Sequence, residues 1–375
     1  MRVLYVFRSL AYWGGIERIL VDKMNNLVSM YGYEVYMLTT DQGCHPVPYH
    51  LDQRVQLKDL GIKLHQQYRY HGIKRGLILW KLLRLYKQRL SKELVKINPD
   101  VIVCTTSNYW DVNILAKIKG KTPLVVECHS IYKQTIGLKG LKGSFSDYLY
   151  KKGLSHAQTI VTLTEKDACD WRRIHKCVKV IPNMVHLNEG EVSSLQNKHV
   201  IWVGRFDYQK RPLEMIDIWK KVYPKFPDWH LDMYGEGELL NEVEDKARSL
   251  NMNIHIHQPT SNIFDCYRRS SFLVSTSLFE PFGLVIPEAM SCGLPVVAYK
   301  SSYGPVSILS DGIDGCLVEM NNGKVMTQVI CALMNDKNKR LIIGQSAKNT
   351  SLKYSREIIM PMWNALFNDI LMNLR

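Results

Sequence analysis

Short runs of β-branched and other apolar residues alternate along nearly the whole chain with longer segments of helical periodicity. Short apolar runs of this kind are typical of strands buried on both faces, and strands that alternate with helices are typical of βαβ units. The sequence therefore predicts an α/β fold with parallel sheets. The expected strands are Val3–Phe7, Glu34–Thr39, Val101–Cys104, Leu124–Glu127, Thr159–Leu163, Val178–Ile181, Val200–Val203, His230–Tyr234, Asn253–His257, Phe272–Ser275 and Pro295–Tyr299.

The alternation is interrupted once, by the polar stretch NEGEVSSLQNK at residues 188–198, after which a strand-like run restarts it. At roughly 100–200 residues per domain, a chain of 375 residues is expected to form two domains. We therefore predict two Rossmann-like domains, residues 1–187 and 188–355, that face one another across a cleft. Residues 356–375 are predicted to form an amphipathic helix with apolar positions at Ile359, Met362, Trp363, Leu366, Phe367 and Ile370.

Composition places the chain among folded proteins without a membrane span. Apolar residues make up 46% and charged residues 22% of the sequence, which argues against disorder and coiled coil. The 9 cysteines are scattered and never spaced as CxxC, which argues against a zinc ribbon or a disulfide framework and fits a reducing compartment. The first apolar run is too short for a signal peptide, and a cytoplasmic location is expected.

Positive charge is concentrated in the first half of the chain. Residues 1–185 hold 29 Lys and Arg against 14 Asp and Glu, whereas residues 186–375 hold 20 against 21. The asymmetry predicts that the first half faces anions.

The segment Arg69–Lys92 is the most basic part, with 8 Lys or Arg and no acidic residue. A helix over it would place a core-facing apolar stripe on one side and leave Ile78 and Leu85 near the basic face. Apolar residues among Lys and Arg suit a lipid headgroup region, so we predict contact with an anionic membrane surface. The alternative is a solvated basic face on an enzyme with a soluble acceptor. The expected core-facing stripe is Leu79, Leu82, Leu83, Tyr86 and Leu90.

The segment Glu280–Ala298, EPFGLVIPEAMSCGLPVVA, carries the strongest chemical signal. Pro287 suits the first turn of a helix, and a Gly-x-Pro sequence then ends that helix before a buried strand. The loop Glu280–Leu284 therefore lies at a helix N-terminus beyond the carboxyl end of a strand, where free N–H groups attract phosphate and Gly283 permits close approach. Glu280 and Glu288 flank that loop and suit vicinal hydroxyls of a sugar and a ribose. The alternative is a surface glutamate before an ordinary helix.

Two further glycine-containing segments follow expected strands. Gly204 with Arg205 and Lys210, five positions apart, would place two cations over one anion at the same sheet edge, although a solvated charged loop remains an alternative. Gly14 and Gly15 open a helix after the first strand and offer a second backbone cradle. The segment 235–237, GEG, lacks the third glycine of a dinucleotide fingerprint and is interpreted as a turn.

Together these segments resemble the GT-B retaining glycosyltransferases of family 4, the "glycosyl transferases group 1" class. The resemblance covers nearly the whole chain: GGIE at 14–17, CHS at 128–130, VTLTEKD at 161–167, VIPN at 180–183, VGRFDYQKRP at 203–212, MYGEGEL at 233–239, STSLFEPFGLVIPEAMSCGLPVVA at 275–298 and DGIDGCLV at 311–318. It implies the GT-B fold, a nucleotide sugar bound mainly by the second domain, an acceptor bound by the first, and a last helix that returns to the first domain. The alternative for that helix is an ordinary terminal helix of the second domain.

The resemblance also implies roles for individual residues. Arg205 and Lys210 match the diphosphate-binding pair, Glu280 is expected to face the donor sugar, and Glu288 to hold the ribose. His129 matches a histidine that contacts the donor sugar, although a single His at a strand end is equally often a capping or core residue. Where the family often has Asp after this histidine, the chain has Ser130. The expected backbone contacts to phosphate or sugar oxygens come from Gly14, Gly15, Gly204, Phe282, Gly283 and Leu284.

The function predicted from these features is retaining transfer of a hexose or N-acetylhexosamine from a UDP- or GDP-linked donor, with UDP favoured, to a glycan or lipid-linked acceptor of a surface polysaccharide or lipopolysaccharide. No metal and no cofactor beyond the nucleotide sugar is implied, because two cations and a helix N-terminus can carry the charge of the leaving diphosphate.

Two other classes are weighed against this prediction. A GT-B epimerase lacks the EPFG…PEA run as spaced here, and a phosphorylase would need a pyridoxal-phosphate lysine site and usually a longer chain. A basic nucleic-acid-binding protein would show a recognised module, and none is found in the sequence.

Overall fold

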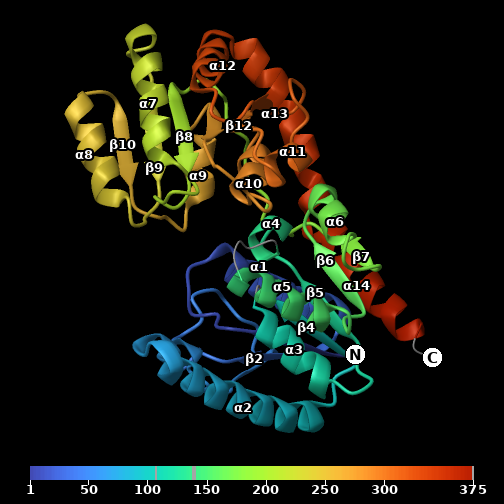
Figure 1. The fold of residues 1–375 in the computed structure, drawn as a ribbon. Helices are drawn as coiled ribbons and strands as arrows, with labels where there is room; N and C mark the ends of the chain where they lie inside the picture. The colour runs from blue at the N-terminus through green and yellow to red at the C-terminus, as the bar shows by residue number, and fades with distance from the viewer. Residues whose placement is uncertain (106–107, 137–140, 374–375) are drawn as a thin grey trace. The chain divides into compact units, whose positions relative to one another are not determined.

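The computed structural model describes residues 1–105, 108–136 and 141–373, and it divides the chain into two compact units (Figure 1). The first unit comprises Met1–Met184 together with Ile359–Arg375, and the second comprises Val185–Ile358. The chain thus leaves the first unit three residues before the expected boundary at 187 and re-enters it three residues after the expected boundary at 355. The terminal segment belongs to the first unit, as the resemblance implied.

The first unit is built on a seven-stranded sheet in the order β3-β2-β1-β4-β5-β6-β7, in which every pairing is parallel. Strand order reverses at β1, which lies between β2 and β4. In open parallel sheets, ligands bind beyond the carboxyl ends of the strands at such a switch point. The strands are β1 (Arg2–Phe7), β2 (Glu34–Thr39), β3 (Gln56–Asp59), β4 (Val101–Thr105), β5 (Leu124–Glu127), β6 (Thr159–Thr162) and β7 (Val178–Val180).

Helices cover both faces of this sheet (Figure 1). One face packs on α1 and α14, and the other on α2, α3 and α5, which explains why the central strands are apolar on both sides. The helices are α1 (Gly15–Tyr31), η1 (Leu64–Arg69), α2 (Gly72–Ile97), α3 (Tyr109–Ile118), α4 (Tyr132–Thr135), α5 (Leu141–Leu154), α6 (Glu165–Trp171) and α14 (Arg356–Met372).

The last helix contributes a full apolar stripe to the core of the first unit. Its buried residues are those expected from the sequence, with one exchange. Met362 was expected in the stripe but is 36% exposed, whereas Met360 is fully buried. The correction follows from helical geometry, because Met360 lies one position from Ile359 and three from Trp363 on the side that faces the sheet.

The second unit contains a six-stranded parallel sheet in the order β10-β9-β8-β11-β12-β13. Its switch point lies at β8, between β9 and β11. A core with Trp202, Phe206 and Trp219 fills the space between one face and the helices α7, α8 and α12. The strands are β8 (His199–Val203), β9 (His230–Tyr234), β10 (Ile254–His257), β11 (Phe272–Ser275), β12 (Val296–Tyr299) and β13 (Cys316–Val318). The helices are α7 (Pro212–Val222), η2 (Tyr223–Lys225), α8 (Leu240–Leu250), α9 (Ile263–Arg268), α10 (Val285–Ser291), α11 (Gly304–Ile308), α12 (Gly323–Asn335), α13 (Lys337–Ser351) and η3 (Leu352–Tyr354).

The turn expected at residues 235–237 connects β9 to α8. Gly235 and Gly237 are both required there, because a Cβ at these positions would lie 1.9 Å from the Gly204 carbonyl oxygen and 2.5 Å from the Phe206 carbonyl oxygen. Phe206 N donates to Glu236 O at 2.8 Å. The glycines therefore let this turn press against the loop that follows β8.

Candidate functional site

In the second unit the loops after β8 and β11 meet at the switch point, and an ion pair joins them. Lys210 Nζ contacts Glu280 Oε1, although 70 positions separate the two residues. Only 16% of the Lys210 side chain and 6% of the Glu280 side chain are exposed. Ser277 Oγ donates to the same Glu280 oxygen at 2.8 Å, and Lys210 N donates to Asp207 Oδ1 at 2.9 Å. Neighbouring side chains thus hold both charges in place.

Arg205 follows Gly204 directly and stays accessible. Its guanidinium forms an ion pair with Asp207 at 2.9 Å and donates to Gln209 Oε1 at 3.3 Å, while 68% of the side chain is exposed. Gln209 in turn donates to the Phe279 carbonyl at 3.0 Å, which ties the two loops together again. The predicted cations therefore differ: Lys210 is enclosed and paired, whereas Arg205 can reorient toward an incoming anion.

The EPFG loop has the tight backbone that its sequence suggests. Gly283 adopts a φ of +91°, a left-handed conformation that glycine alone adopts readily. Gly304 N, at the start of α11, donates to the Glu280 carbonyl at 2.8 Å, and a Cβ at Gly304 would lie 2.0 Å from the Phe282 carbonyl oxygen. Phe282 is buried and packs edge-on against Tyr354 at 5.3 Å between ring centroids. Leu284 then forms the N-cap of α10.

Glu288 lies in the first turn of α10, a helix of 7 residues, and is 4% exposed. The other carboxylate of the pair, Glu280, is equally buried. Two buried carboxylates eight positions apart on a loop and the helix after it are an arrangement that can hold hydroxyl groups.

In the first unit, α1 begins at the cradle that the sequence predicts. Gly14 is the N-cap with extended backbone, Gly15 is the first helical residue, and Tyr49 Oη donates to the Gly14 carbonyl at 3.1 Å. Glu17, one turn into α1, approaches the same point, because a Cβ at Gly14 would lie 2.1 Å from Glu17 Oε2. Burial raises the pKa of Glu17, and His129 partly opposes that shift.

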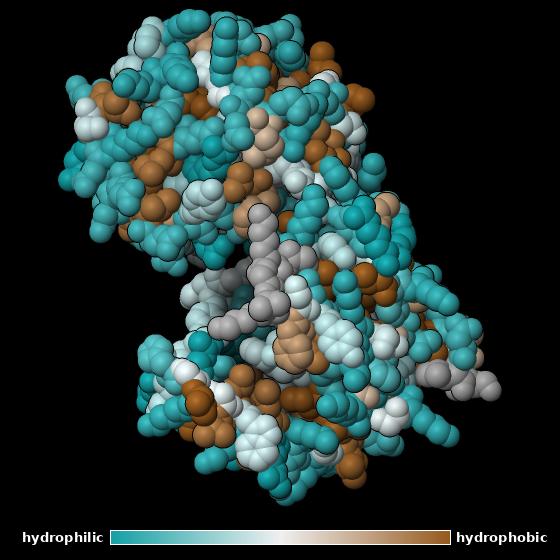
Figure 2. Space-filling view, viewed as in Figure 1, coloured by the Kyte–Doolittle hydropathy of each residue, from teal (hydrophilic) through white to brown (hydrophobic). Residues whose placement is uncertain are grey.

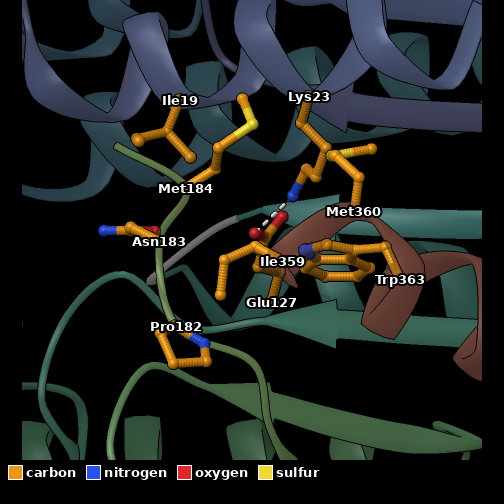
Figure 3. Close-up of a pocket in the computed structure, with 9 residues that line it drawn as sticks. All are labelled: Ile19, Lys23, Glu127, Pro182, Asn183, Met184, Ile359, Met360 and Trp363. Carbon is orange, nitrogen blue, oxygen red and sulfur yellow. Dashed lines mark hydrogen bonds and ion pairs between the residues drawn. The ribbon is translucent and has the colours of Figure 1, made fainter. Parts of the chain in front are cut away.

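His129 follows β5 and has a side chain that is 5% exposed. Its Nε2 lies 3.1 Å from Glu127 Oε1, at ion-pair distance, without the alignment of a hydrogen bond. Glu127 is also in contact with Lys23 of α1 and accepts a hydrogen bond from Thr105 Oγ1 at 3.1 Å. Figure 3 shows the Lys23 amine directed at the Glu127 carboxylate. The imidazole thus adjoins a buried ion pair.

The charges of this cluster depend on one another. Burial by itself would raise the pKa of Glu127, but Lys23 and His129 outweigh it and lower that pKa to about 2. Burial lowers the pKa of the Lys23 amine, and Glu127 opposes that shift. The carboxylate is therefore ionised throughout the neutral range.

Several supporting residues were not predicted from the sequence. The sequence pattern places Glu127 only at the end of a strand and gives no signal for Lys23. Asp207 and Ser277, which hold the charges of the second unit, were also missed although they lie within the quoted motifs. Gly304 carries no local signal at all. The predicted site residues form two groups, one in each unit. That both groups line one cleft stays a prediction.

In residues 1–105, 108–136 and 141–373, no group of three or more His, Cys, Asp or Glu side chains is arranged to hold a metal ion. Over the same residues, no helix combines the length and the apolar character needed to cross a bilayer.

Comparison with family models decides the classification. Residues 13–189 match the model described as "Glycosyltransferase Family 4", and residues 188–350 match "Glycosyl transferases group 1". The chain belongs to the group 1 glycosyltransferases. This hexosyltransferase has the GT-B fold, since it superposes on S. aureus TarM, solved with UDP, with a TM-score of 0.78 at 16% identity over 98% of this chain and 99% of that one. Sucrose-phosphate synthase from Thermosynechococcus elongatus gives 0.81 at 16% identity, over 99% of both chains.

Two curated relatives match nearly the whole length of this glycosyltransferase. The "Amylovoran biosynthesis glycosyltransferase AmsD" of Erwinia amylovora is 24% identical over 98% of this chain and 99% of its own. The "GalNAc-alpha-(1->4)-GalNAc-alpha-(1->3)-diNAcBac-PP-undecaprenol alpha-1,4-N-acetyl-D-galactosaminyltransferase" of Campylobacter jejuni is 23% identical over 99% of both chains.

Proposed function

We propose that this glycosyltransferase transfers a hexose or N-acetylhexosamine from a UDP-sugar, without a metal ion and with retention, to a glycan or lipid-linked acceptor of a cell-surface polymer. The names of its relatives support the acceptor class, because one acts in amylovoran biosynthesis and another on a PP-undecaprenol-linked glycan. UDP bound to TarM supports the donor class. The α linkage in the second relative's name supports retention, since common UDP-hexoses are α-linked.

The observation that carries the proposal is the Lys210–Glu280 pair at the switch point of the second unit. A diphosphate leaving from this position would meet an ammonium that is already fixed in place and an accessible guanidinium from Arg205. Preorganised donors of this kind stabilise developing charge without reorganisation. These residues can therefore supply the role that a divalent ion has in other glycosyltransferases.

A nucleotide-sugar panel tests this function. Purified enzyme is screened by thermal shift with UDP- and GDP-sugars, and a donor at 100 times its Kd should add about 2.7 kcal/mol of stability. The best donor is then used in a UDP-release assay with and without EDTA, and the anomeric configuration of the product is read by NMR. We expect EDTA-insensitive release and an α-linked product. Loss of activity with EDTA that returns with Mg²⁺ or Mn²⁺ would reject the metal-free mechanism, and a β-linked product would reject retention.

The basic segment of the first unit supports a membrane-associated acceptor, with a correction to the residues involved. Ile78 and Leu85 were expected to be exposed, but both are half-buried, and Leu85 packs against the core because α2 is rotated further toward it. The exposed apolar residues are Ile73, Leu77 and Trp80, at 85%, 58% and 58%. They recur on one side of α2 at helical spacing.

Basic residues surround this exposed stripe. Arg75 lies over the ring of Tyr68, which is 59% exposed, and Arg84 lies over the ring of Trp80. Figure 2 shows apolar residues mixed with hydrophilic ones over this part of the surface. Exposed aromatic and aliphatic groups beside cations suit an anionic bilayer interface, where each cation near the surface contributes about 1 kcal/mol. We propose that the first half of α2 lies against an anionic membrane.

Co-sedimentation with vesicles tests this contact. We expect the enzyme to bind phosphatidylglycerol-containing vesicles at low salt, to bind phosphatidylcholine vesicles weakly, and to lose anionic binding when Ile73, Leu77 and Trp80 are replaced by Ser. The charge control replaces Lys220 and Lys221 of α7 by Gln, which removes two exposed cations elsewhere and should leave binding unchanged. Equal, salt-independent recovery with both vesicles would reject the membrane contact.

A further inference from the structure

The buried ion pair of the first unit has no evident structural purpose. Lys23 is 3% exposed and Glu127 is 2% exposed, and the pair joins α1 to the end of β5. Taking two such charges out of water costs several kcal/mol per ion, and replacement by apolar residues is often neutral or stabilising. A pair of this kind is weak evidence for stability, and its neighbours suggest a functional reason for it.

The Glu127 carboxylate is held from three sides. Its Oε1 contacts Lys23 Nζ and lies 3.1 Å from His129 Nε2, while its Oε2 accepts from Thr105 Oγ1 at 3.1 Å. The ammonium of Lys23 and the hydroxyl of Thr105 fix the position of the carboxylate. The carboxylate in turn determines the electrostatic potential at the imidazole of His129. Glu17 of α1 is a further charged group near the ring, since His129 lowers its pKa against the effect of burial.

The last helix also takes part in this arrangement. The Lys23 ammonium lies 4.0 Å from the centroid of the Trp363 ring and 5.3 Å from that of Tyr5. Figure 3 shows the indole of Trp363 beside the Lys23–Glu127 contact. A small pocket adjoins the pair and is lined in part by Pro182 and Met360, from the two segments where the chain leaves and re-enters this unit. Trp363 therefore holds Lys23 over the carboxylate.

We infer that Glu127, held by Lys23, Thr105 and Trp363, is a positioning residue that orients the His129 imidazole for contact with the donor sugar. Since Nε2 lies 3.1 Å from the carboxylate, the other ring nitrogen, Nδ1, is the one left to contact substrate. Carboxylates commonly play this orienting role behind functional histidines. The inference rests on the proposed role of His129 in sugar transfer.

A double-mutant cycle tests the inference. Glu127→Gln is expected to lower kcat by about 10- to 100-fold with little change in donor KM. In a His129→Ala background the same substitution is expected to cost less than about 2-fold, because the group that Glu127 positions is gone. An equal loss in both backgrounds would overturn the positioning role while leaving the proposed function intact. Full activity of His129→Ala would instead remove the role proposed for the histidine, and this inference with it.

Two further measurements separate positioning from folding. The paired variant Lys23→Met with Glu127→Gln leaves no uncompensated buried charge, so it should fold with a thermal midpoint near that of the wild type. We expect it to keep the kcat defect and to change the pH profile of kcat and the ¹⁵N spectrum of His129. Asp167→Asn is the matched control, because Asp167 is another buried carboxylate of this unit, bonded to Tyr132 N and Trp171 Nε1. A wild-type pH profile and His129 spectrum in the paired variant would overturn the inference.

Discussion

Lys210 and Glu280 form an ion pair that fastens the loop after β8 to the loop after β11, on the two sides of the switch point of the second sheet. The same two residues were assigned from the sequence to different parts of the donor, the diphosphate and the sugar. Their contact means that the cation and the carboxylate are positioned by each other. The ion pair between Lys210 and Glu280 is therefore in place before a donor binds.

Lys210→Ala should lower kcat by about 100-fold or more, since a preorganised donor at a leaving group typically contributes about 2.7–4 kcal/mol to the transition state. UDP release under saturating donor measures the effect. Lys220→Ala, which removes an exposed lysine of α7, is the control and should retain full activity. A Lys210→Ala enzyme with wild-type kcat would show that the ammonium does not act on the diphosphate.

Stability should respond differently from activity at this pair. Lys210→Met alone leaves Glu280 buried without its cation and should destabilise the fold by an amount near the lower end of the roughly 3–5 kcal/mol seen for broken buried pairs. Adding Glu280→Gln removes the uncompensated charge and should recover most of that loss without recovering activity. Urea unfolding of the three proteins measures both steps. If the double variant were less stable than Lys210→Met, the ion pair would not be the source of the loss.

Glu288→Ala should mainly weaken donor binding, because contacts to the ribose change little as the sugar leaves. We expect a higher donor KM with a nearly unchanged kcat, checked by steady-state kinetics and by titration calorimetry with UDP. Glu319→Ala is a suitable control, because Glu319 is an exposed carboxylate of the same unit paired with Lys300. A fall in kcat at constant KM would place Glu288 at the reacting centre instead.

Most of the fold was predictable because buried parallel strands carry a strong local pattern. Two of the four edge strands, β3 and β13, were missed, for physical reasons that differ. Gln56–Asp59 (β3) is polar and only partly buried, so it lacks an apolar run, and the apolar run of Cys316–Val318 (β13) is only three residues long. Both lie at sheet edges, where one side lacks a neighbouring strand and the demand for apolar residues is lower.

The site was predictable where its residues share a local motif, as Glu280 and Glu288 do. Lys23 and Glu127 are separated by 104 positions, and a lysine within a helical pattern is normally solvent-exposed. Only the tertiary structure shows that this lysine points into the core. The same holds for Gly304, where a side chain would clash with the Phe282 carbonyl of another loop.

Gly304→Ala should therefore impair donor binding. The added Cβ would lie 2.0 Å from the Phe282 carbonyl oxygen, so the EPFG loop must shift. We expect a raised donor KM and a lower thermal midpoint. Gly76→Ala in α2 is the matched control, because nothing lies within 4 Å of its added Cβ and alanine favours a helix by about 1 kcal/mol. Wild-type donor binding in Gly304→Ala would show that the loop tolerates displacement.

A column of imidazole rings lies on the second sheet at β8, β9 and β10. The rings of His199 and His230 stack at 4.8 Å, and those of His230 and His255 at 5.3 Å. Asp232 accepts from His199 at 2.6 Å and from His257 at 2.9 Å. His230 thus lies between two other imidazoles, and it is in contact with His255 through ring nitrogens 3.0 Å apart.

This column should make the fold less stable at mildly acidic pH. Burial lowers the pKa of His230, and His199 and His255 lower it further, while Asp232 and Asp228 oppose the shift. The unfolded chain, with a histidine pKa near 6.5, then binds the proton before the folded chain does, so stability is complete above that pH and falls as the pH drops below it. We expect a lower thermal midpoint at pH 5.5 than at pH 7.5, and a smaller difference in His230→Asn. The exposed His45, replaced by Asn, should leave the difference unchanged. If His230→Asn showed the full wild-type pH dependence, the effect would have to come from another group.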